Sequence, residues 1–214
     1  MDHRCGVDVV TSADLVVVPR GRPLAPDDWA TLVKGLPGAE QRRIGSVYRN
    51  DDQQDSAIGW SLLCRLADDH GVSVWRNSAG RPVTDPPVDI SLSHGGGWIA
   101  VAASRAGRVG VDVEAVRDVS PALARRCLSP AEVGWMESAP GARDRQERFL
   151  RLWTAKEAYL KAIGIGLGVD PRSFTLDCSS PAPRLRGAEG RRWLFRSGAP
   201  ADGVCVTVCE ERAG

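Results

Sequence analysis

The stretch Val109-Gly110-Val111-Asp112-Val113-Glu114 alternates between valines and other residues along its whole length. A period of two predicts a β-strand in which the valines face one way, while Asp112 and Glu114 share the opposite face. Such a pair of carboxylates is commonly a solvated sheet face. It can also form part of a site for a hard cation, if further oxygen atoms complete the coordination.

A long helix further along the chain carries a third carboxylate. The sequence predicts this helix from about residue 145 to residue 163. Glu157 and Lys161 stand four residues apart and therefore share one helix face, which is commonly a surface pair. Alternatively, Glu157 could supply a further oxygen ligand to Mg²⁺, and Lys161 could contact substrate phosphates. A cluster of this kind suits phosphoryl transfer, in which catalysis is largely positioning and charge neutralisation.

An earlier predicted strand, over residues 88–93, ends at a run of glycines. The sequence there is Ser91-Leu92-Ser93-His94-Gly95-Gly96-Gly97-Trp98. A histidine at the end of a strand is more often structural than catalytic. Glycines, however, let a ligand approach the backbone closely, and free N–H groups beside a hydroxyl can bind phosphate. We therefore expect a phosphate-binding turn at this strand end.

The rest of the pattern mixes helices and strands. Apolar residues at three- and four-residue spacing predict a helix over residues 52–69, and Ser129-Pro130-Ala131-Glu132 is a capping box that begins another. Further strands are predicted over residues 72–75, 98–103, 173–178, 192–196 and 204–210. This order of elements predicts an α+β protein with mostly antiparallel sheets.

Composition argues against several classes of protein. The chain has 214 residues and a formal net charge of +1, so no overall field marks it as a nucleic-acid binder. No apolar run approaches the roughly 20 residues needed to span a bilayer, and the first residues do not resemble a signal peptide. We therefore expect a cytoplasmic protein with no membrane and no nucleic-acid partner. Its six scattered cysteines lack metal-site spacing, so we expect reduced thiols.

In their order and spacing, three stretches resemble the signature of the surfactin-synthetase type of 4′-phosphopantetheinyl transferase. They are the glycine-run segment 91–98, the strand 110–114 and the helical segment Trp153-Thr154-Ala155-Lys156-Glu157-Ala158-Tyr159-Leu160-Lys161. The resemblance covers roughly residues 37 to 178. It implies a monomer of two similar α/β halves with pseudo-twofold symmetry, residues 1–106 and 107–214, and an active site in the cleft between them.

The resemblance also implies a role for each residue of the motifs. Coenzyme A would be the co-substrate and Mg²⁺ the cofactor. The metal ligands would be Asp112, Glu114 and Glu157, and the catalytic set would be Asp112, Glu157, Lys161 and His94. Lys161 would contact the pyrophosphate, with help from Lys156. Ser93 and His94 would hold the ribose phosphate, Gly80-Arg81-Pro82 would line the adenine pocket, and Arg43 would be a basic phosphate contact.

The implied reaction is attack by a serine hydroxyl of an apo acyl or peptidyl carrier protein on the phosphate attached to pantetheine. Adenosine 3′,5′-bisphosphate would leave, and Glu157, directly or through a water, would take the serine proton. Two other functions stay open. One is a magnesium-dependent hydrolase or nucleotidyl transferase that uses the same carboxylates. The other is a catalytically degenerate module that binds coenzyme A or a carrier protein without transfer.

This chain departs from the family pattern at three positions. Gly95 stands where many relatives have serine, Asp55 where the family often has arginine, and Glu40 where it often has lysine. We therefore expect the affinity for coenzyme A to be the property most affected. Three arginines that follow the metal strand could meet an acidic helix of the carrier, or could simply be solvated: Arg117, Arg125 and Arg126.

Overall fold

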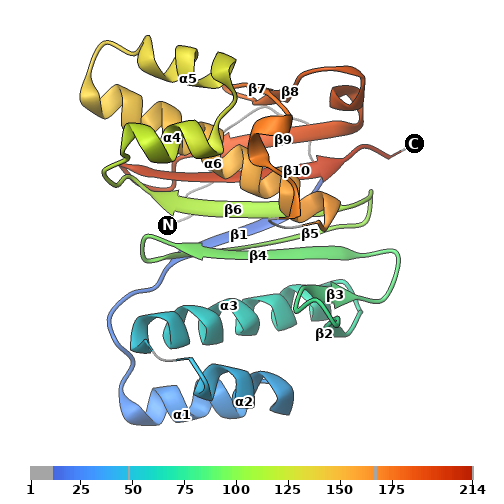
Figure 1. The fold of residues 1–214 in the computed structure, drawn as a ribbon. Coiled ribbons are helices and arrows are strands. Elements are labelled where there is room, and N and C mark those ends of the chain that lie inside the picture. Colours follow the sequence, from blue (N-terminus) through green and yellow to red (C-terminus); the bar gives the residue numbers. More distant parts are fainter. Residues whose placement is uncertain (1–11, 48, 166–167, 214) are drawn as a thin grey trace.

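A computed structural model describes residues 12–47, 49–165 and 168–213. Its main strands form two antiparallel sheets of three strands each, with the orders β1-β5-β4 and β6-β10-β9 (Figure 1). The strands of the first sheet are β1 (Asp14–Pro19), β4 (Asp89–Gly95) and β5 (Trp98–Ser104). Those of the second are β6 (Val109–Ala115), β9 (Trp193–Gly198) and β10 (Val204–Glu211). The predicted α+β class with antiparallel sheets is confirmed.

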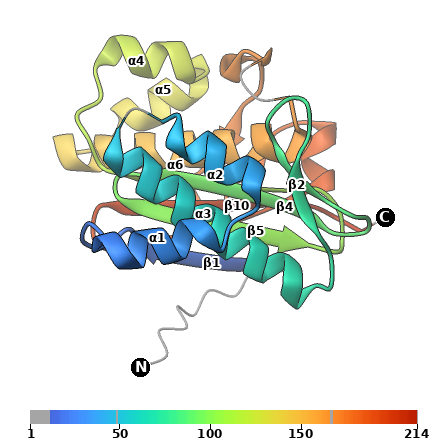
Figure 2. The ribbon, with the colours of Figure 1, turned by 90° about the horizontal axis from the view of Figure 1, so that it is seen from below.

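Helices cover the outer side of each sheet (Figure 1). One group consists of α1 (Pro26–Lys34), α2 (Gly38–Gly45) and α3 (Asn50–Asp69), and α3 runs across β4 and β5 (Figure 2). The other group consists of α4 (Pro121–Cys127), α5 (Pro130–Glu137) and α6 (Ala142–Ile163). The short elements are the ribbons β2 (Val74–Arg76) with β3 (Pro82–Thr84) and β7 (Leu176–Asp177) with β8 (Arg184–Leu185), and the 3₁₀ turns η2 (Pro171–Ser173) and η3 (Ala188–Arg192).

The same order of elements occurs twice along the chain. Each half begins with a strand, continues through helices and a small ribbon, and ends with two more strands, and the last strand lies in the middle of each sheet. This repeat is the basis on which we retain the division into residues 1–106 and 107–214 as a proposal. The boundary would fall in the turn between β5 and β6.

Three apolar clusters hold these layers together. One packs α3 onto β4 and β5, and one packs α6 and its neighbouring helices onto β9 and β10. The third lies between the two sheets and contains the valines of β6, namely Val109, Val111 and Val113, all 0% exposed. The alternation in the sequence therefore predicted the inward face of β6 correctly.

Local features of the sequence fix the start of α5 and the end of α6. α5 begins with the predicted capping box, in which the backbone N–H of Ser129 donates to Glu132 Oε2 at 2.6 Å. α6 ends at Gly164, whose φ of +75° is the left-handed conformation that terminates helices and favours glycine. The helix therefore ends shortly after Lys161, which lies in its last turn.

Several elements differ from the sequence-based expectation. β1, α2 and α4 were not predicted, and the strand expected over residues 173–178 is reduced to β7. Before β7, Pro171 follows Asp170, whose side chain accepts a hydrogen bond from the backbone N–H of Arg172 at 2.9 Å. This local bond stabilises the turn η2, which includes Ser173, the first residue of the expected strand. Among the described helices, none is long and apolar enough to cross a membrane.

Candidate active site

β4 and β6 lie side by side in the middle of the molecule, although they belong to different sheets (Figure 1). Side chains of β4 join them. Ser91 Oγ accepts a hydrogen bond from the backbone N–H of Val111 at 3.0 Å, and Ser93 Oγ donates to Asp112 Oδ1 at 2.7 Å. Ser91 and Ser93 are two residues apart on a strand and therefore share one face of β4, which is the face that contacts β6. Hydrogen bonds from two β4 side chains thus join β4 to β6, the strand that carries Asp112.

The two oxygen atoms of Asp112, which is 5% exposed, lie in different environments. Oδ1 accepts hydrogen bonds from Ser93 Oγ and from the ammonium of Lys161, both at 2.7 Å. Oδ2 is buried and has no hydrogen-bond partner among the described residues. A buried carboxylate oxygen without a partner is unfavourable, so it is a position where a cation or a substrate group can bind.

Glu157 and Glu114 lie within electrostatic reach of Asp112. Burial raises the pKa of Glu157, and the negative charge of Asp112 raises it further. The same two causes, in the same order, raise the pKa of Glu114. Glu157 Oε1 is also buried without a hydrogen-bond partner in the part of the chain that the structure describes. β6 and α6 thus bring the three predicted metal ligands into one region.

These three carboxylates supply the hard oxygen atoms that Mg²⁺ prefers. Two of the oxygens, Asp112 Oδ2 and Glu157 Oε1, are buried without a partner and are suited to coordinate a cation. Within residues 12–47, 49–165 and 168–213, however, no group of three or more His, Cys, Asp or Glu side chains is arranged to hold a metal ion by itself. The residues therefore fit a Mg²⁺ ion whose coordination is completed by water and substrate oxygens.

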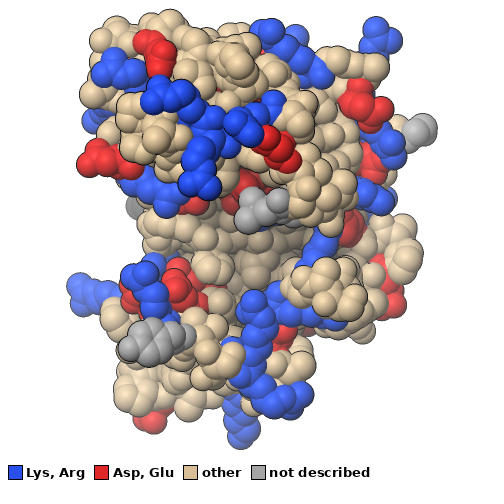
Figure 3. Space-filling view, in the orientation of Figure 1, with Lys and Arg blue, Asp and Glu red and all other residues tan. Residues whose placement is uncertain are grey.

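A cavity of about 290 Å³ adjoins this region. It is lined by Arg43, Ser56, Arg76, Pro82, Leu92, Ser93, His94, Asp112 and Lys161. The surface is hollowed between the two halves, and lysine or arginine side chains stand on both rims (Figure 3). Burial lowers the pKa of His94, and the carboxylate of Asp55, 3.9 Å from Nδ1, opposes this shift. His94 is therefore mostly neutral near pH 7 and can hydrogen-bond as donor or acceptor.

The structure thus brings together five of the predicted nucleotide-binding residues: Arg43, Pro82, Ser93, His94 and Lys161. Three further lining residues, Ser56, Arg76 and Leu92, were given no role from the sequence. The reversed charge at Glu40 was the available signal for Arg76, because an acid near an anion site requires a cationic partner. Leu92 lies inside the segment expected to bind phosphate, whereas no sequence pattern pointed to Ser56.

The two acids that reverse the family's usual charge are each paired with an arginine. Arg76 donates to both carboxylate oxygens of Glu40, at 2.7 and 3.0 Å, and its guanidinium lies 4.3 Å from the centre of the Trp60 ring. Arg20 donates to Asp55 at 2.6 Å. Both acids are almost fully buried. The negative charges are therefore neutralised by this chain's own arginines.

Two of the three glycines, Gly95 and Gly96, allow the end of β4 to pack closely against β6. A Cβ atom at Gly95 would lie 2.6 Å from the carbonyl oxygen of Val113 and 2.9 Å from Glu114 Oε2, and a Cβ atom at Gly96 would clash with Ala115. The end of β4 can therefore approach β6 only because both positions are glycine. Packing against β6 therefore requires glycine at these two positions and leaves no room for a serine side chain at Gly95. The phosphate-binding role expected for this strand end stays a prediction.

Lys156 does not face the site. Its side chain is 0% exposed, and its ammonium forms an ion pair with Glu132 Oε2 at 2.9 Å. The ammonium also donates to the carbonyl oxygens of Pro171 and Phe174, at 2.6 and 2.8 Å. Neighbouring residues of a helix point about 100° apart, so a helix that directs Glu157 toward Asp112 directs Lys156 away from it. The expected contact between Lys156 and coenzyme A is therefore wrong.

The segment expected to line the adenine pocket contributes only in part. Pro82 lines the cavity, whereas Gly80 lies in the preceding turn with a φ of +79°. The guanidinium of Arg81 points away from this turn and contacts Asp89 and the carbonyl oxygen of Lys161. The guanidinium of Arg81 is bound to protein groups, and the place of Gly80-Arg81-Pro82 in an adenine pocket stays a prediction.

Comparison with known proteins agrees with this geometry. Residues 108–209, which include β6 and α6, match the model of the 4′-phosphopantetheinyl transferase superfamily. A phosphopantetheinyl transferase of Thraustochytrium sp. is 30% identical over 87% of this chain and 75% of the relative. A 4′-phosphopantetheinyl transferase of Paxillus involutus is 31% identical over 74% of this chain and 70% of the relative. One of Bacillus subtilis is 26% identical over 72% of each chain. This chain belongs to the 4′-phosphopantetheinyl transferase superfamily.

Proposed function

We propose that this chain is a magnesium-dependent 4′-phosphopantetheinyl transferase of the surfactin-synthetase type, which uses coenzyme A to modify a serine of an apo acyl or peptidyl carrier protein. The transferase activity follows from the family. The observation that carries the finer proposal is the convergence of Asp112, Glu114, Glu157 and Lys161 beside a cavity, with two buried carboxylate oxygens that lack partners among the described residues.

The proposed step is a substitution at phosphorus. The serine oxygen of the carrier forms a bond to the phosphorus that bears pantetheine, and the bond from that phosphorus to the bridging oxygen breaks. Adenosine 3′,5′-bisphosphate leaves with the bridging oxygen. Glu157 is the proposed base that takes the serine proton, directly or through a water. If the variant Glu157→Gln bound metal and kept the full rate, the base would lie elsewhere.

The other residues would bind and orient the substrate. Bound Mg²⁺, held by Asp112, Glu114 and Glu157, would neutralise charge at the pyrophosphate. Lys161 would add a cationic contact there, because it lines the cavity and its ammonium donates to Asp112 Oδ1. Ser93, His94 and Arg43 would hold the ribose phosphate, and Gly80 and Pro82 would border the base.

The carrier would dock beside α4. Arg117, Arg125 and Arg126 are exposed there, and carriers that present an acidic helix next to their serine would complement them. A cytoplasmic location and a monomeric state stay predictions from the sequence.

The test is intact mass spectrometry of an apo carrier protein incubated with this protein, coenzyme A and Mg²⁺, beside a sample with a chelator. A mass gain of one phosphopantetheine on the carrier, absent with the chelator, is the expected result. Turnover of nucleotides without a carrier would instead support a hydrolase or nucleotidyl transferase. Coenzyme A binding without any mass gain across several carriers would identify a degenerate binding module.

A further inference from the structure

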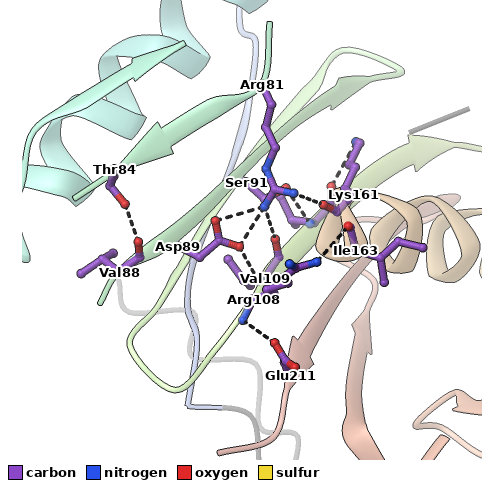
Figure 4. A network of polar contacts seen from close by, with 11 residues as sticks. Arg81, Thr84, Val88, Asp89, Ser91, Arg108, Val109, Lys161, Ile163 and Glu211 are labelled. Atoms are coloured by element: carbon purple, nitrogen blue, oxygen red, sulfur yellow. Dashed lines mark hydrogen bonds and ion pairs between the residues drawn. The ribbon is translucent and has the colours of Figure 1, made fainter. Parts of the chain in front are cut away.

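Arg81 connects the first half of the molecule to the end of α6 (Figure 4). Its Nη2 donates to both carboxylate oxygens of Asp89 on β4, at 2.8 and 3.1 Å, and its Nη1 donates to the carbonyl oxygen of Lys161 at 2.6 Å. Asp89 Oδ2 in turn accepts from the backbone N–H of Val109 on β6 at 2.8 Å. Arg81 and Asp89 therefore form one unit that touches β4, β6 and α6.

The last turn of a helix needs such partners. No N–H group within the helix donates to its final four carbonyl oxygens, and positive charge near a helix C-terminus is favourable. In α6 the carbonyl oxygen of Lys161 accepts from the backbone N–H of Gly164 at 3.1 Å and from Arg81. The Arg81–Asp89 pair is only partly exposed, at 24% for each side chain, so its hydrogen bonds are partly shielded from solvent. The turn that carries Lys161 is thus held from the opposite half of the molecule.

Lys161 is anchored at its other end as well. Its ammonium contacts Asp112 Oδ1 at 2.7 Å and the carbonyl oxygen of Val111 at 3.1 Å. The backbone of Lys161 is therefore fixed through Arg81, and its side chain through β6. Loss of either anchor would change the position of the ammonium relative to Asp112.

We propose that Arg81, held by Asp89, is a positioning residue that fixes Lys161 for catalysis and makes no contact with coenzyme A through its guanidinium. This inference rests on the proposed function of Lys161. It differs from the adenine-pocket role that the family resemblance implied for Arg81. The two roles predict opposite kinetic effects, because a positioning residue affects the chemical step whereas a coenzyme A contact affects substrate binding.

The experiment compares Arg81→Gln, Asp89→Asn and the double variant with wild type. We expect Arg81→Gln to lower kcat about tenfold, because small displacements of a catalytic group are costly, while the Kd of coenzyme A stays within about twofold. Asp89→Asn should act in the same direction but less, and the double variant should be no worse than Arg81→Gln alone, since both break one unit. A tenfold rise in Kd with an unchanged kcat would overturn the proposal and make Arg81 a coenzyme A contact.

Arg108→Gln is the matched control. Arg108 Nη1 donates to the carbonyl oxygen of Ile163 at 3.1 Å, but from an exposed position and two residues beyond Lys161 (Figure 4). We expect its kcat to stay within about twofold of wild type. Equal losses in Arg108→Gln and Arg81→Gln would mean that fraying of the helix end in general, and not the position of Lys161, determines the rate.

A second readout does not depend on activity. The chain has three lysines, Lys34, Lys156 and Lys161, of which Lys34 is exposed and Lys156 is buried. Labelling with an amine-reactive acylating reagent, followed by peptide mass spectrometry, therefore gives the reactivity of Lys161 relative to Lys34 in the same molecules. Arg81→Gln and Asp89→Asn should raise this ratio and Arg108→Gln should not.

An unchanged labelling ratio in both variants would overturn the proposal even if the wild type transfers no phosphopantetheine. A wild type without activity but with the expected labelling would contradict the proposed function alone. The thermal midpoint of each variant is measured alongside, and Asp89→Asn carries the test if Arg81→Gln does not fold.

Discussion

The two oxygens of the buried Asp112 side chain differ in their hydrogen-bond partners. Oδ1 has a hydroxyl and an ammonium as partners, which offset the loss of water. Oδ2 has none among the described residues, and the negative charge of Asp112 adds to the effect of burial in raising the pKa of both Glu114 and Glu157. At the scale of single residues, the site is therefore arranged for positive charge that a substrate complex can bring.

Gly95→Ser tests whether the glycine run is a packing requirement. The added Cβ would lie 2.6 Å from the backbone oxygen of Val113, which cannot rotate away. We expect a loss of about 1–3 kcal/mol of stability, hence a thermal midpoint lower by about 2–10 °C, and a slower transfer rate. Differential scanning fluorimetry and a transfer assay measure both.

Gly134→Ser is the control for this change, because a Cβ at Gly134 meets nothing within 4 Å and the position is exposed in α5. It should leave the midpoint unchanged or raise it slightly. Tighter coenzyme A binding by Gly95→Ser at an unchanged midpoint would instead mean that a hydroxyl is missing from the phosphate site and that the steric argument is wrong.

At the scale of elements, α6 has two faces with different tasks. One face carries Glu157 and Lys161 toward β6. The other carries Lys156 to Glu132, which also accepts from the backbone N–H groups of Ser129 and Leu176, at 2.6 and 2.7 Å. This buried pair joins α5, α6 and the segment before β7. The face that carries Glu157 and Lys161 is therefore oriented by contacts on the far side of the same helix.

Lys156→Met separates a structural role from a ligand role. It leaves Glu132 buried without its cation, which typically costs about 3–5 kcal/mol and corresponds to a midpoint lower by about 10 °C. The Kd of coenzyme A, measured by calorimetry at a temperature where the variant is folded, should stay unchanged. The exposed Lys34→Met is the control and should alter neither quantity. A weaker Kd at an unchanged midpoint would show that Lys156 reaches the substrate.

Elements with a strong local signal could be predicted from the sequence. The alternation of β6, the long apolar face of α3 and the capping box of α5 each specify one structure, and the carboxylates followed from them. Helix periodicity already directs Lys156 away from Glu157, but its partners could not be predicted, because Glu132 and the turn around Pro171 lie close to it only after folding. The partners of the Arg81 side chain could not be predicted for the same reason, since Lys161 is 80 residues away.

At the scale of the whole molecule, the candidate site lies where β4 meets β6 and α6. Ser93 and His94 come from β4, Asp112 from β6 and Glu157 from α6, and side chains join β4 to β6. Basic side chains border the hollow on both sides (Figure 3). Although the net charge of the chain is only +1, lysine and arginine side chains give the hollow a locally positive rim. Such a rim suits an anionic substrate and an acidic carrier.

The salt dependence of carrier recognition follows from this rim. If Arg125 and Arg126 meet an acidic helix, the KM for the carrier should rise about tenfold between about 50 and 300 mM NaCl, because exposed charges are screened. Arg125→Ser/Arg126→Ser should raise the KM at low salt and flatten its salt dependence, whereas Arg65→Ser on α3 should not. A KM that is insensitive to salt in the wild type would count against docking through these arginines.

The most direct test of the three-carboxylate site is the rate at which Asp112→Asn modifies an apo carrier in the intact-mass assay with coenzyme A and Mg²⁺. Asparagine keeps the size and the hydrogen bond from Ser93 but removes the charge. We predict a rate at least about a hundredfold lower than wild type at an unchanged thermal midpoint, while the exposed control Asp144→Asn retains full rate. Transfer by Asp112→Asn at the wild-type rate would contradict the account.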